Sequence, residues 1–128
     1  MIAVAAGIVV RENKIMLCQR KPQANLALKW EFPGGKLEPG ETPEQALERE
    51  LMEELRIRTR TGRVYDVCRR MESGLDLLIL FYHSEILEGE PRPVECSDIA
   101  WVLPNDLLHY ELAPADAQVA QRIIREGL

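Results

Sequence analysis

Apolar residues in this chain fall into short runs separated by polar turns or by glycine and proline, a pattern typical of β-strands. Val4–Val10 and Ile15–Cys18 flank the polar turn Arg11–Lys14, so the pattern predicts a hairpin. After an irregular loop, Trp30–Phe32 predicts a short strand. The Pro33-Gly34-Gly35 sequence is a strong breaker and is expected to end that strand.

The second half of the chain predicts three more strands, over Arg63–Met71, Leu75–Ile86 and Ile99–Leu103. The middle one contains the uninterrupted apolar run Leu77–Tyr82. Such a run is too apolar for an edge strand, so we expect it in the centre of a sheet.

The best-defined helix is predicted from Thr42 to about Leu55 or Arg56. Thr42 is a good N-cap, Pro43 suits the first helical position, and Gln45 completes a capping box. These three signals together define where the helix begins.

A second helix is predicted over Ala115–Arg125, and Pro104 is expected to open a helical turn through Leu108. The helix should face inward with Val119, Ala120, Ile123 and Ile124. Strands and helices interleave without regular βαβ alternation, which favours an α+β fold or a three-layer sandwich around a mixed sheet. A chain of 128 residues fits one domain, residues 1–128.

Composition narrows the classes of function. The net charge of −5 argues against a protein that coats a nucleic acid polymer, but a small anionic substrate remains compatible if a metal ion or a few basic residues face it. The apolar N-terminus, Met1–Val10, has no preceding basic residues and is too short to span a membrane. We therefore expect a cytoplasmic protein with no membrane partner.

The three cysteines, Cys18, Cys68 and Cys96, are odd in number, widely spaced and without a CxxC pair. A disulfide scaffold or a zinc site is therefore not expected, and a reducing cytosol fits best. The simplest interpretation is that all three are small buried hydrophobic residues.

Acidic residues gather on one side of the first predicted helix. At 100° per residue, Leu47, Leu51 and Leu55 form the core stripe. Glu50, Glu53 and Glu54 cluster on a neighbouring face, because Glu53 and Glu54 follow Glu50 by three and four positions. Carboxylates so placed repel one another, and a bound cation would offset that repulsion. Oxygen ligands suit Mg²⁺, Mn²⁺ or Ca²⁺ rather than zinc.

The alternative interpretation is an ordinary solvated acidic face, which is common on helices. Two features favour a site instead. Arg49 lies beside Glu50 and four residues before Glu53, so it can hold a carboxylate in place. The helix also follows Gly34-Gly35, where the backbone can approach a phosphate or a metal closely.

The spacing of these residues resembles the Nudix box. The matching positions are Gly35, Glu41, Arg49, Glu50, Leu51, Glu53, Glu54 and the aliphatic Ile57. Arg56 stands where the family has glycine. A glycine just after a helix usually forms a left-handed cap, so the departure concerns the loop geometry more than the chemistry.

Beyond the box, the Trp-Glu-Phe-Pro-Gly-Gly-Lys stretch, the Glu95…Trp101 spacing and the stretch at 112–116 resemble the MutT-type nucleoside triphosphate pyrophosphohydrolases, nearest the CTP pyrophosphohydrolase branch. The resemblance implies an α/β/α sandwich around a mixed sheet. It implies Mg²⁺, with Mn²⁺ as an alternative, and hydrolysis of a nucleoside triphosphate to the monophosphate and pyrophosphate by attack of water on a phosphorus.

The resemblance also assigns residues. The implied metal ligands are Gly34 or Gly35 through a carbonyl, Glu50, Glu53, Glu54 and Glu95. The implied catalytic residues are Arg49, which orients carboxylates, together with Glu50, Glu53 and Glu95. For the proton acceptor Glu50 is favoured and Glu95 is second. The implied substrate-binding residues are Arg20, Phe32, Gly34, Gly35, Lys36 and Asp116.

Three of the residues implied to line the nucleotide site have a structural alternative: Asp116 can cap the last helix, Phe32 can pack in the core, and Arg20 can be a solvated strand residue. An ionised Asp116 accepts hydrogen bonds but cannot donate them, which favours a base edge with donors. We therefore favour cytosine nucleotides and keep oxidised guanine (8-oxo-dGTP) open.

Two competing functions remain at this stage. One is a Nudix hydrolase of another nucleoside diphosphate derivative, and the other is a non-catalytic Nudix-fold module that binds a nucleotide or a partner. The second predicts loss of the box carboxylates, whereas Glu41, Glu50, Glu53 and Glu54 are all present. The expected partner is a small-molecule nucleoside triphosphate, and either a monomer or a homodimer fits.

Overall fold

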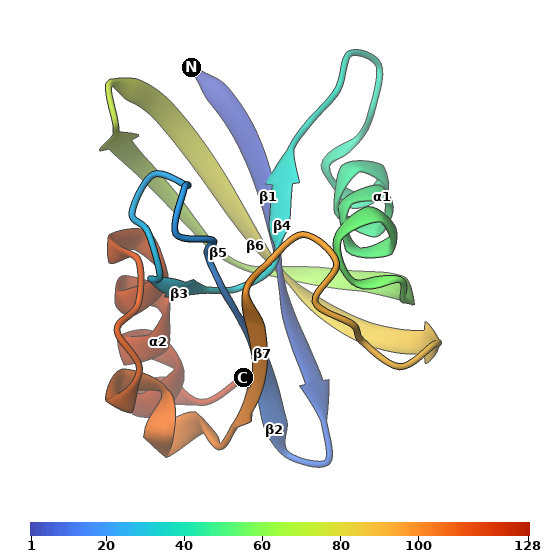
Figure 1. Ribbon diagram of the computed structural model, residues 1–128, viewed down its shortest axis with the longest axis vertical. Coiled ribbons are helices and arrows are strands. Elements are labelled where there is room, and N and C mark those ends of the chain that lie inside the picture. The colour runs from blue at the N-terminus through green and yellow to red at the C-terminus, as the bar shows by residue number, and fades with distance from the viewer.

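The computed structural model describes residues 1–128 and contains one seven-stranded sheet with a helix on each side (Figure 1). The elements in chain order are β1 (Ile2–Arg11), β2 (Lys14–Gln19), β3 (Trp30–Glu31), β4 (Gly34–Lys36), α1 (Pro43–Leu55), β5 (Arg58–Glu72), β6 (Leu75–Glu88), β7 (Asp98–Val102), the 3₁₀ helix η1 (Pro104–His109) and α2 (Pro114–Glu126). The expected α/β/α sandwich around a mixed sheet is confirmed.

The main path of the sheet runs β3-β2-β1-β6-β5, while β4 pairs with β1 and β7 pairs with β2. The β1–β6 pairing is parallel and the other pairings are antiparallel, so the sheet is mixed. Strand β6 lies between β1 and β5, which confirms the prediction that the Leu77–Tyr82 run occupies a central strand.

The two faces of the sheet carry separate hydrophobic cores, because successive strand residues point to opposite faces. Under α1, the buried side chains are Ala5, Val9, Met16, Cys18, Leu47, Leu51, Leu55, Ile57 and Tyr82. Under α2, the core includes Ile8, Leu17, Phe32, Ile79, Phe81, Val119 and Ile123. The predicted stripe of α1 is thus confirmed, whereas Ile124 of α2 is 36% exposed and does not face inward as expected. Only Ile123 of that pair falls within the arc that α2 presents to the sheet.

Helix α1 begins as predicted. The Thr42 side chain accepts from the Gln45 N–H at 3.1 Å, and the Gln45 side chain accepts from the Thr42 N–H at 3.0 Å. The helix ends at Arg56, which adopts the left-handed conformation with φ 58° and ψ 40°. The chain therefore keeps the cap geometry that glycine usually provides, with a side chain in its place.

Two strand predictions need correction. Gly34–Lys36 does not simply break the chain but forms β4, paired with Val4–Ala6 of β1. A sequence of this kind can pair because Gly34 allows a close approach: a Cβ there would lie 2.0 Å from the Ala5 oxygen. Strand β5 starts at Arg58, before the predicted Arg63, because register shifts around residues 58–66 let it continue along β6 despite the polar sequence.

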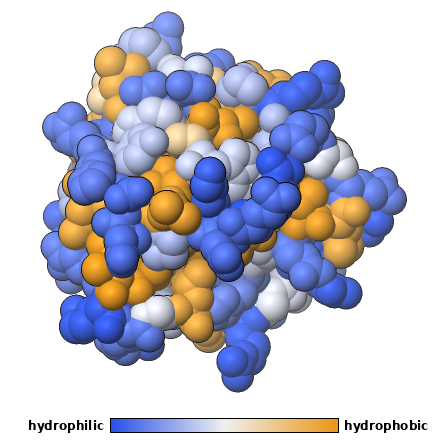
Figure 2. All heavy atoms as spheres, turned by 90° about the horizontal axis from the view of Figure 1, so that it is seen from below, coloured by the Kyte–Doolittle hydropathy of each residue, from blue (hydrophilic) through white to orange (hydrophobic).

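The outer surface is mixed. On the face seen in Figure 2, hydrophobic groups are interspersed with hydrophilic ones. Neither helix combines the length and apolar composition that a membrane crossing would require.

Candidate active site

The candidate site lies where β4 meets α1, and a glycine brings them together. A Cβ on Gly35 would lie 2.4 Å from Cδ of Glu50, so no side chain fits between β4 and the carboxylate of Glu50. Antiparallel pairing with β1 holds β4 in this place. The glycine pair therefore sets the distance between the strand and the acidic face of α1.

Arg49 gathers the carboxylates on this side of α1. Its guanidinium donates to both oxygens of Glu41, at 2.7 and 2.9 Å, and to Glu50 at 2.8 Å. It also donates to Glu53 at 3.2 Å and to the Lys36 carbonyl at 3.1 Å. The pKa of the Arg49 guanidinium is raised, chiefly by the hydrogen bond with Glu41. Arg49 is thus an orienting cation that links the helix, β4 and the loop between them.

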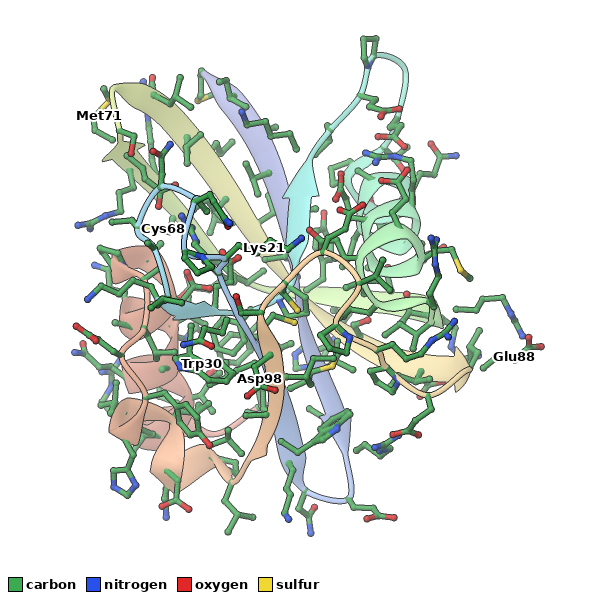
Figure 3. The ribbon with its side chains drawn as sticks, in the orientation of Figure 1. Lys21, Trp30, Cys68, Met71, Glu88 and Asp98 are labelled. Atoms are coloured by element: carbon green, nitrogen blue, oxygen red, sulfur yellow. The ribbon has the colours of Figure 1, made fainter.

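The third of the predicted metal ligands on this helix, Glu54, faces a pocket. This pocket, which we call the carboxylate pocket, has a volume of about 380 Å³ and its acidic lining residues are Glu31, Glu54, Glu72 and Glu95. The basic residues on its walls are Arg20, Lys21 and Lys36. Figure 3 shows Lys21 on the loop between β2 and β3, above the central strands.

Burial and nearby negative charge dominate the electrostatics of this pocket. Desolvation, followed by repulsion from Glu50, Glu31 and Glu95, raises the pKa of Glu54 to about 9. Desolvation also raises the pKa of Glu50, against the opposing effect of Arg49. Ionisation of these carboxyl groups is unfavourable while no cation is bound. A divalent cation that binds to them would displace their protons.

The donor set fits a hard divalent cation, because the predicted ligands are all oxygen atoms in a partly buried cluster of negative charge. As the side chains stand, no three acidic, histidine or cysteine groups converge within reach of one ion. Glu50 and Glu53 are tied to Arg49, while Glu54 and Glu95 face the carboxylate pocket. The members of the second pair are joined at the end of α1, where the Glu54 carbonyl accepts from the Glu95 N–H at 3.3 Å.

A second, smaller space of about 180 Å³ adjoins the carboxylate pocket, and we call it the inner pocket. All six predicted substrate-binding residues line it: Arg20, Phe32, Gly34, Gly35, Lys36 and Asp116. Arg20, Glu31, Lys36, Glu72 and Leu77 line both pockets, so the two form one continuous region.

Asp116 is buried in the wall of the inner pocket. Its Oδ1 accepts from the Phe32 N–H at 2.9 Å, and the residue is only 6% exposed. It lies in the first turn of α2 but is not the N-cap, which is Ala113, so the interpretation of Asp116 as the helix cap was wrong. Desolvation and the nearby Glu31 raise the pKa of Asp116 to about 8, which keeps its carboxyl largely protonated at neutral pH. Burial of Asp116 therefore favours the neutral carboxyl over the ionised, acceptor-only form.

Arg20 is not a solvated strand residue. Its guanidinium forms ion pairs with Glu31 at 3.0 Å and with Glu72 at 3.4 Å. Glu31 is held in a desolvated position, which raises the pKa of its carboxyl despite Arg20. Arg20 and Glu31 line both the carboxylate pocket and the inner pocket that contains Asp116. Phe32 packs edge-to-face on Phe81 with centroids 5.9 Å apart and forms part of the apolar wall.

Comparison with known proteins decides the family. The model of the NUDIX domain matches residues 1–123. The chain belongs to the Nudix family. A CTP pyrophosphohydrolase of Escherichia coli (strain K12) is 41% identical over 116 residues, covering 91% of this chain and 86% of that protein. An 8-oxo-dGTP diphosphatase of Haemophilus influenzae is 37% identical over 126 residues, covering 98% and 93%.

The fold of this Nudix hydrolase also matches solved structures. The solution structure of the E. coli ORF135 protein superposes with a TM-score of 0.85 at 38% identity, covering 98% of this chain and 89% of that one. The likeness therefore extends over nearly the whole chain.

Several residues of this Nudix site were missed by the sequence reasoning. Glu41 was matched to the box but assigned no role, and it is the main partner of Arg49. Glu31 sits within the Trp-Glu-Phe stretch, but its neighbours Arg20 and Asp116 are brought to it only by tertiary structure. Glu72 is the last residue of β5, and Cys18 and Cys96 come from β2 and the loop before β7. No local sequence signal marks these last three.

Proposed function

We propose that this Nudix hydrolase converts a nucleoside triphosphate to the monophosphate and pyrophosphate, and that its preferred base is cytosine. The observation that carries the proposal is the continuity of the two pockets: an acidic cluster suited to a phosphate-bound cation opens into a small, partly apolar space that contains a buried acid. A nucleotide has the same order of parts, with an oligophosphate at one end and a base at the other.

The residues proposed to hold a divalent cation, Mg²⁺ or alternatively Mn²⁺, are Glu50, Glu53, Glu54 and Glu95, with the backbone carbonyl of Gly34. When bound, the cation supplies neutralisation of the oligophosphate and stabilisation of the charge that develops on it. Arg49 keeps Glu50 and Glu53 oriented through its hydrogen bonds. Glu50 is proposed to accept the proton of the attacking water, with Glu95 as the second candidate.

The proposal for cytosine rests on the protonation of Asp116. A neutral carboxyl can donate its proton to N3 of cytosine while its other oxygen accepts from the N4 amino group. Oxidised guanine presents N–H donors on the corresponding edge and would prefer an ionised carboxylate. Since burial and Glu31 raise the pKa of Asp116 to about 8, the neutral form is available near pH 7. The 41% identity with a CTP pyrophosphohydrolase supports the same choice.

Oxidised guanine is the second candidate, because a relative with 37% identity over 98% of the chain is named an 8-oxo-dGTP diphosphatase. Above the pKa of Asp116 the acceptor-only form would favour that base. The two candidates therefore predict opposite effects of raising the pH on relative turnover.

The test is a panel of canonical, methylated and oxidised nucleoside triphosphates, assayed with Mg²⁺ and with identification of the products. CTP or dCTP should give the highest kcat/KM near pH 7 and yield the monophosphate and pyrophosphate. Preference for 8-oxo-dGTP at that pH would reject cytosine while keeping the reaction. Release of inorganic phosphate alone, or no turnover of any triphosphate, would reject the reaction.

A further inference from the structure

We propose that Cys18 and Cys96 form a reversible disulfide in the wall of the carboxylate pocket when a hydroperoxide oxidises the protein. Both residues line that pocket, although they are far apart in the sequence. Cys96 also packs against the buried cluster that includes Cys18. The inference concerns a modification site and does not depend on which nucleotide the enzyme hydrolyses.

The backbone beside the two cysteines is hydrogen-bonded. In the β2–β7 pairing, Cys18 lies opposite Ile99 and Gln19 lies opposite Asp98, so Cys96 is three residues before the partner of Cys18. The Ser97 N–H donates to the Gln19 carbonyl at 2.9 Å, so a hydrogen bond holds the two segments one residue beyond each cysteine. A disulfide needs its two Cα atoms within about 4.4–6.8 Å, and formation of the bond tests whether the loop that carries Cys96 comes this close to β2.

The two thiols differ in access, which suggests the order of events. Cys96 is partly exposed on the loop, whereas Cys18 is only 4% exposed. The Cys96 sulfur would attack the O–O bond of hydrogen peroxide and become a sulfenic acid, releasing one water. The Cys18 sulfur would then form the S–S bond and displace the hydroxyl as a second water. Two electrons pass from the two sulfurs to the peroxide, and the two thiol protons leave in the waters.

The third cysteine lacks such a partner. Cys68 is on β5, and its thiol donates to Oε1 of Gln118 on α2 at 3.3 Å. Figure 3 shows it beside α2, whereas Asp98, two residues after Cys96, lies at the start of β7. Cys68 therefore provides a matched control within the same chain.

The disulfide would act on the site through the loop that carries Glu95. The Glu54 carbonyl at the end of α1 accepts from the N–H groups of Val94, at 3.1 Å, and Glu95, at 3.3 Å. Forming the bond brings the sulfurs to about 2.05 Å and draws Cys96 toward β2. Because the same loop is attached to α1, the Glu54 and Glu95 carboxylates would move relative to each other. Catalytic groups misplaced on this scale lose activity, so oxidation should reduce turnover about tenfold or more.

The first test measures the bond itself. The full-length protein is reduced, freed of reductant and treated with stoichiometric hydrogen peroxide. The intact mass should fall by about 2 Da, and peptide mapping should recover a cross-linked Cys18–Cys96 peptide. Cys68→Ser should behave in the same way, and Cys96→Ser should form no bond. Cys18→Ala removes the buried partner and should also form no bond. The melting curve of each reduced variant confirms that the variant folds.

A mass gain of about 16 or 32 Da without a cross-linked peptide would overturn the proposal, as would bonding through Cys68.

The second test compares oxidised with reduced turnover for each variant separately. Wild type and Cys68→Ser should lose activity and regain it with dithiothreitol, while Cys96→Ser should keep its own reduced rate. If the disulfide forms but turnover does not change, the proposed effect of the bond on the site is wrong. Because the mass measurement needs no substrate, failure of the proposed function would not affect it.

Discussion

The guanidinium of Arg49 connects three glutamates, Glu41, Glu50 and Glu53, with the carbonyl of Lys36. One side chain thus orders charges from α1, β4 and the intervening loop. Since bidentate pairing needs a planar fork of donors, lysine could not reproduce the contact with Glu41. At the scale of single residues, the site depends on orientation as much as on the carboxylates themselves.

Replacing Glu50 by glutamine removes the negative charge of the side chain and keeps its shape. The introduced amide keeps an oxygen that can accept from Arg49 but lacks the negative charge that a metal ligand or a proton acceptor needs. Turnover with Mg²⁺ should fall by at least about 100-fold, while the melting temperature stays close to that of wild type. Glu44→Gln, an exposed position in the first turn of the same helix, is the control and should retain activity. Turnover near that of wild type in Glu50→Gln would remove Glu50 from the mechanism.

Asp116 should make stability depend on pH. Its pKa is about 8 in the folded protein, above the ordinary value of 3.8, so the folded state binds the proton more tightly than the unfolded chain. Stability from this group is fully present below about pH 4 and declines as the pH rises toward 8, with a slope of up to about 1.4 kcal/mol per pH unit. The free energy of unfolding, measured in urea from about pH 4 to about pH 9, tests this.

Asp116→Asn is the comparison for that experiment. Its amide cannot titrate but can still accept from the Phe32 N–H, so the variant should lose this part of the slope. Glu31 and Glu54 also have raised pKa values and contribute slopes of the same sign, so the difference between the two proteins is the quantity to measure. Parallel curves would mean that Asp116 is ionised in the folded protein.

Among the elements, α1 has a well-formed start and a costly end. The capping box at Thr42 satisfies the backbone N–H groups, whereas Arg56 holds a left-handed conformation with a side chain present. Its guanidinium donates only a long hydrogen bond, 3.4 Å, to the Met52 carbonyl. This position is where the chain departs from the glycine of the Nudix box.

Arg56→Gly should therefore stabilise the protein. Glycine adopts φ 58° without a Cβ penalty, so the free energy of unfolding should rise by up to about 1 kcal/mol, measured by urea denaturation. Arg56→Ala removes the same charge and keeps the Cβ. Equal stabilisation by both variants would assign the effect to charge rather than to backbone conformation.

At the scale of the whole molecule, the sheet and both helices enclose a cluster of carboxylates that is costly in the absence of a cation. Glu54 shows this most clearly, since desolvation and three neighbouring carboxylates raise its pKa to about 9. An ion that binds the folded protein and not the unfolded chain shifts the folding equilibrium toward the folded state. Metal binding and stability should consequently be linked.

Millimolar Mg²⁺ should raise the melting temperature relative to EDTA, and EDTA should abolish turnover. The Mg²⁺-dependent shift should be lost in Glu54→Gln, whereas Glu44→Gln should keep it. Activity that persists in EDTA would contradict the divalent-cation site. A wild-type melting temperature that does not change with Mg²⁺ would contradict it as well.

The sequence by itself determined most of the elements, including the acidic helix α1. Thr42, Pro43 and Gln45 fix the start of α1, and the spacing of Leu47, Leu51 and Leu55 fixes its buried face. These features are local, because they depend on residues three or four positions apart. The Leu77–Tyr82 run likewise predicted a central strand, since only burial on both faces suits it.

Tertiary structure alone decided how the site is assembled and which of its groups are charged. Pairing with β1 turned the Gly34–Lys36 breaker into β4 and brought Gly35 against Glu50. Folding also brought Glu31 and Arg20 beside Asp116, and the resulting desolvation changed the protonation expected for that acid. Protonation in a buried site depends on solvent exclusion and on charges from distant segments, neither of which is encoded in local sequence spacing.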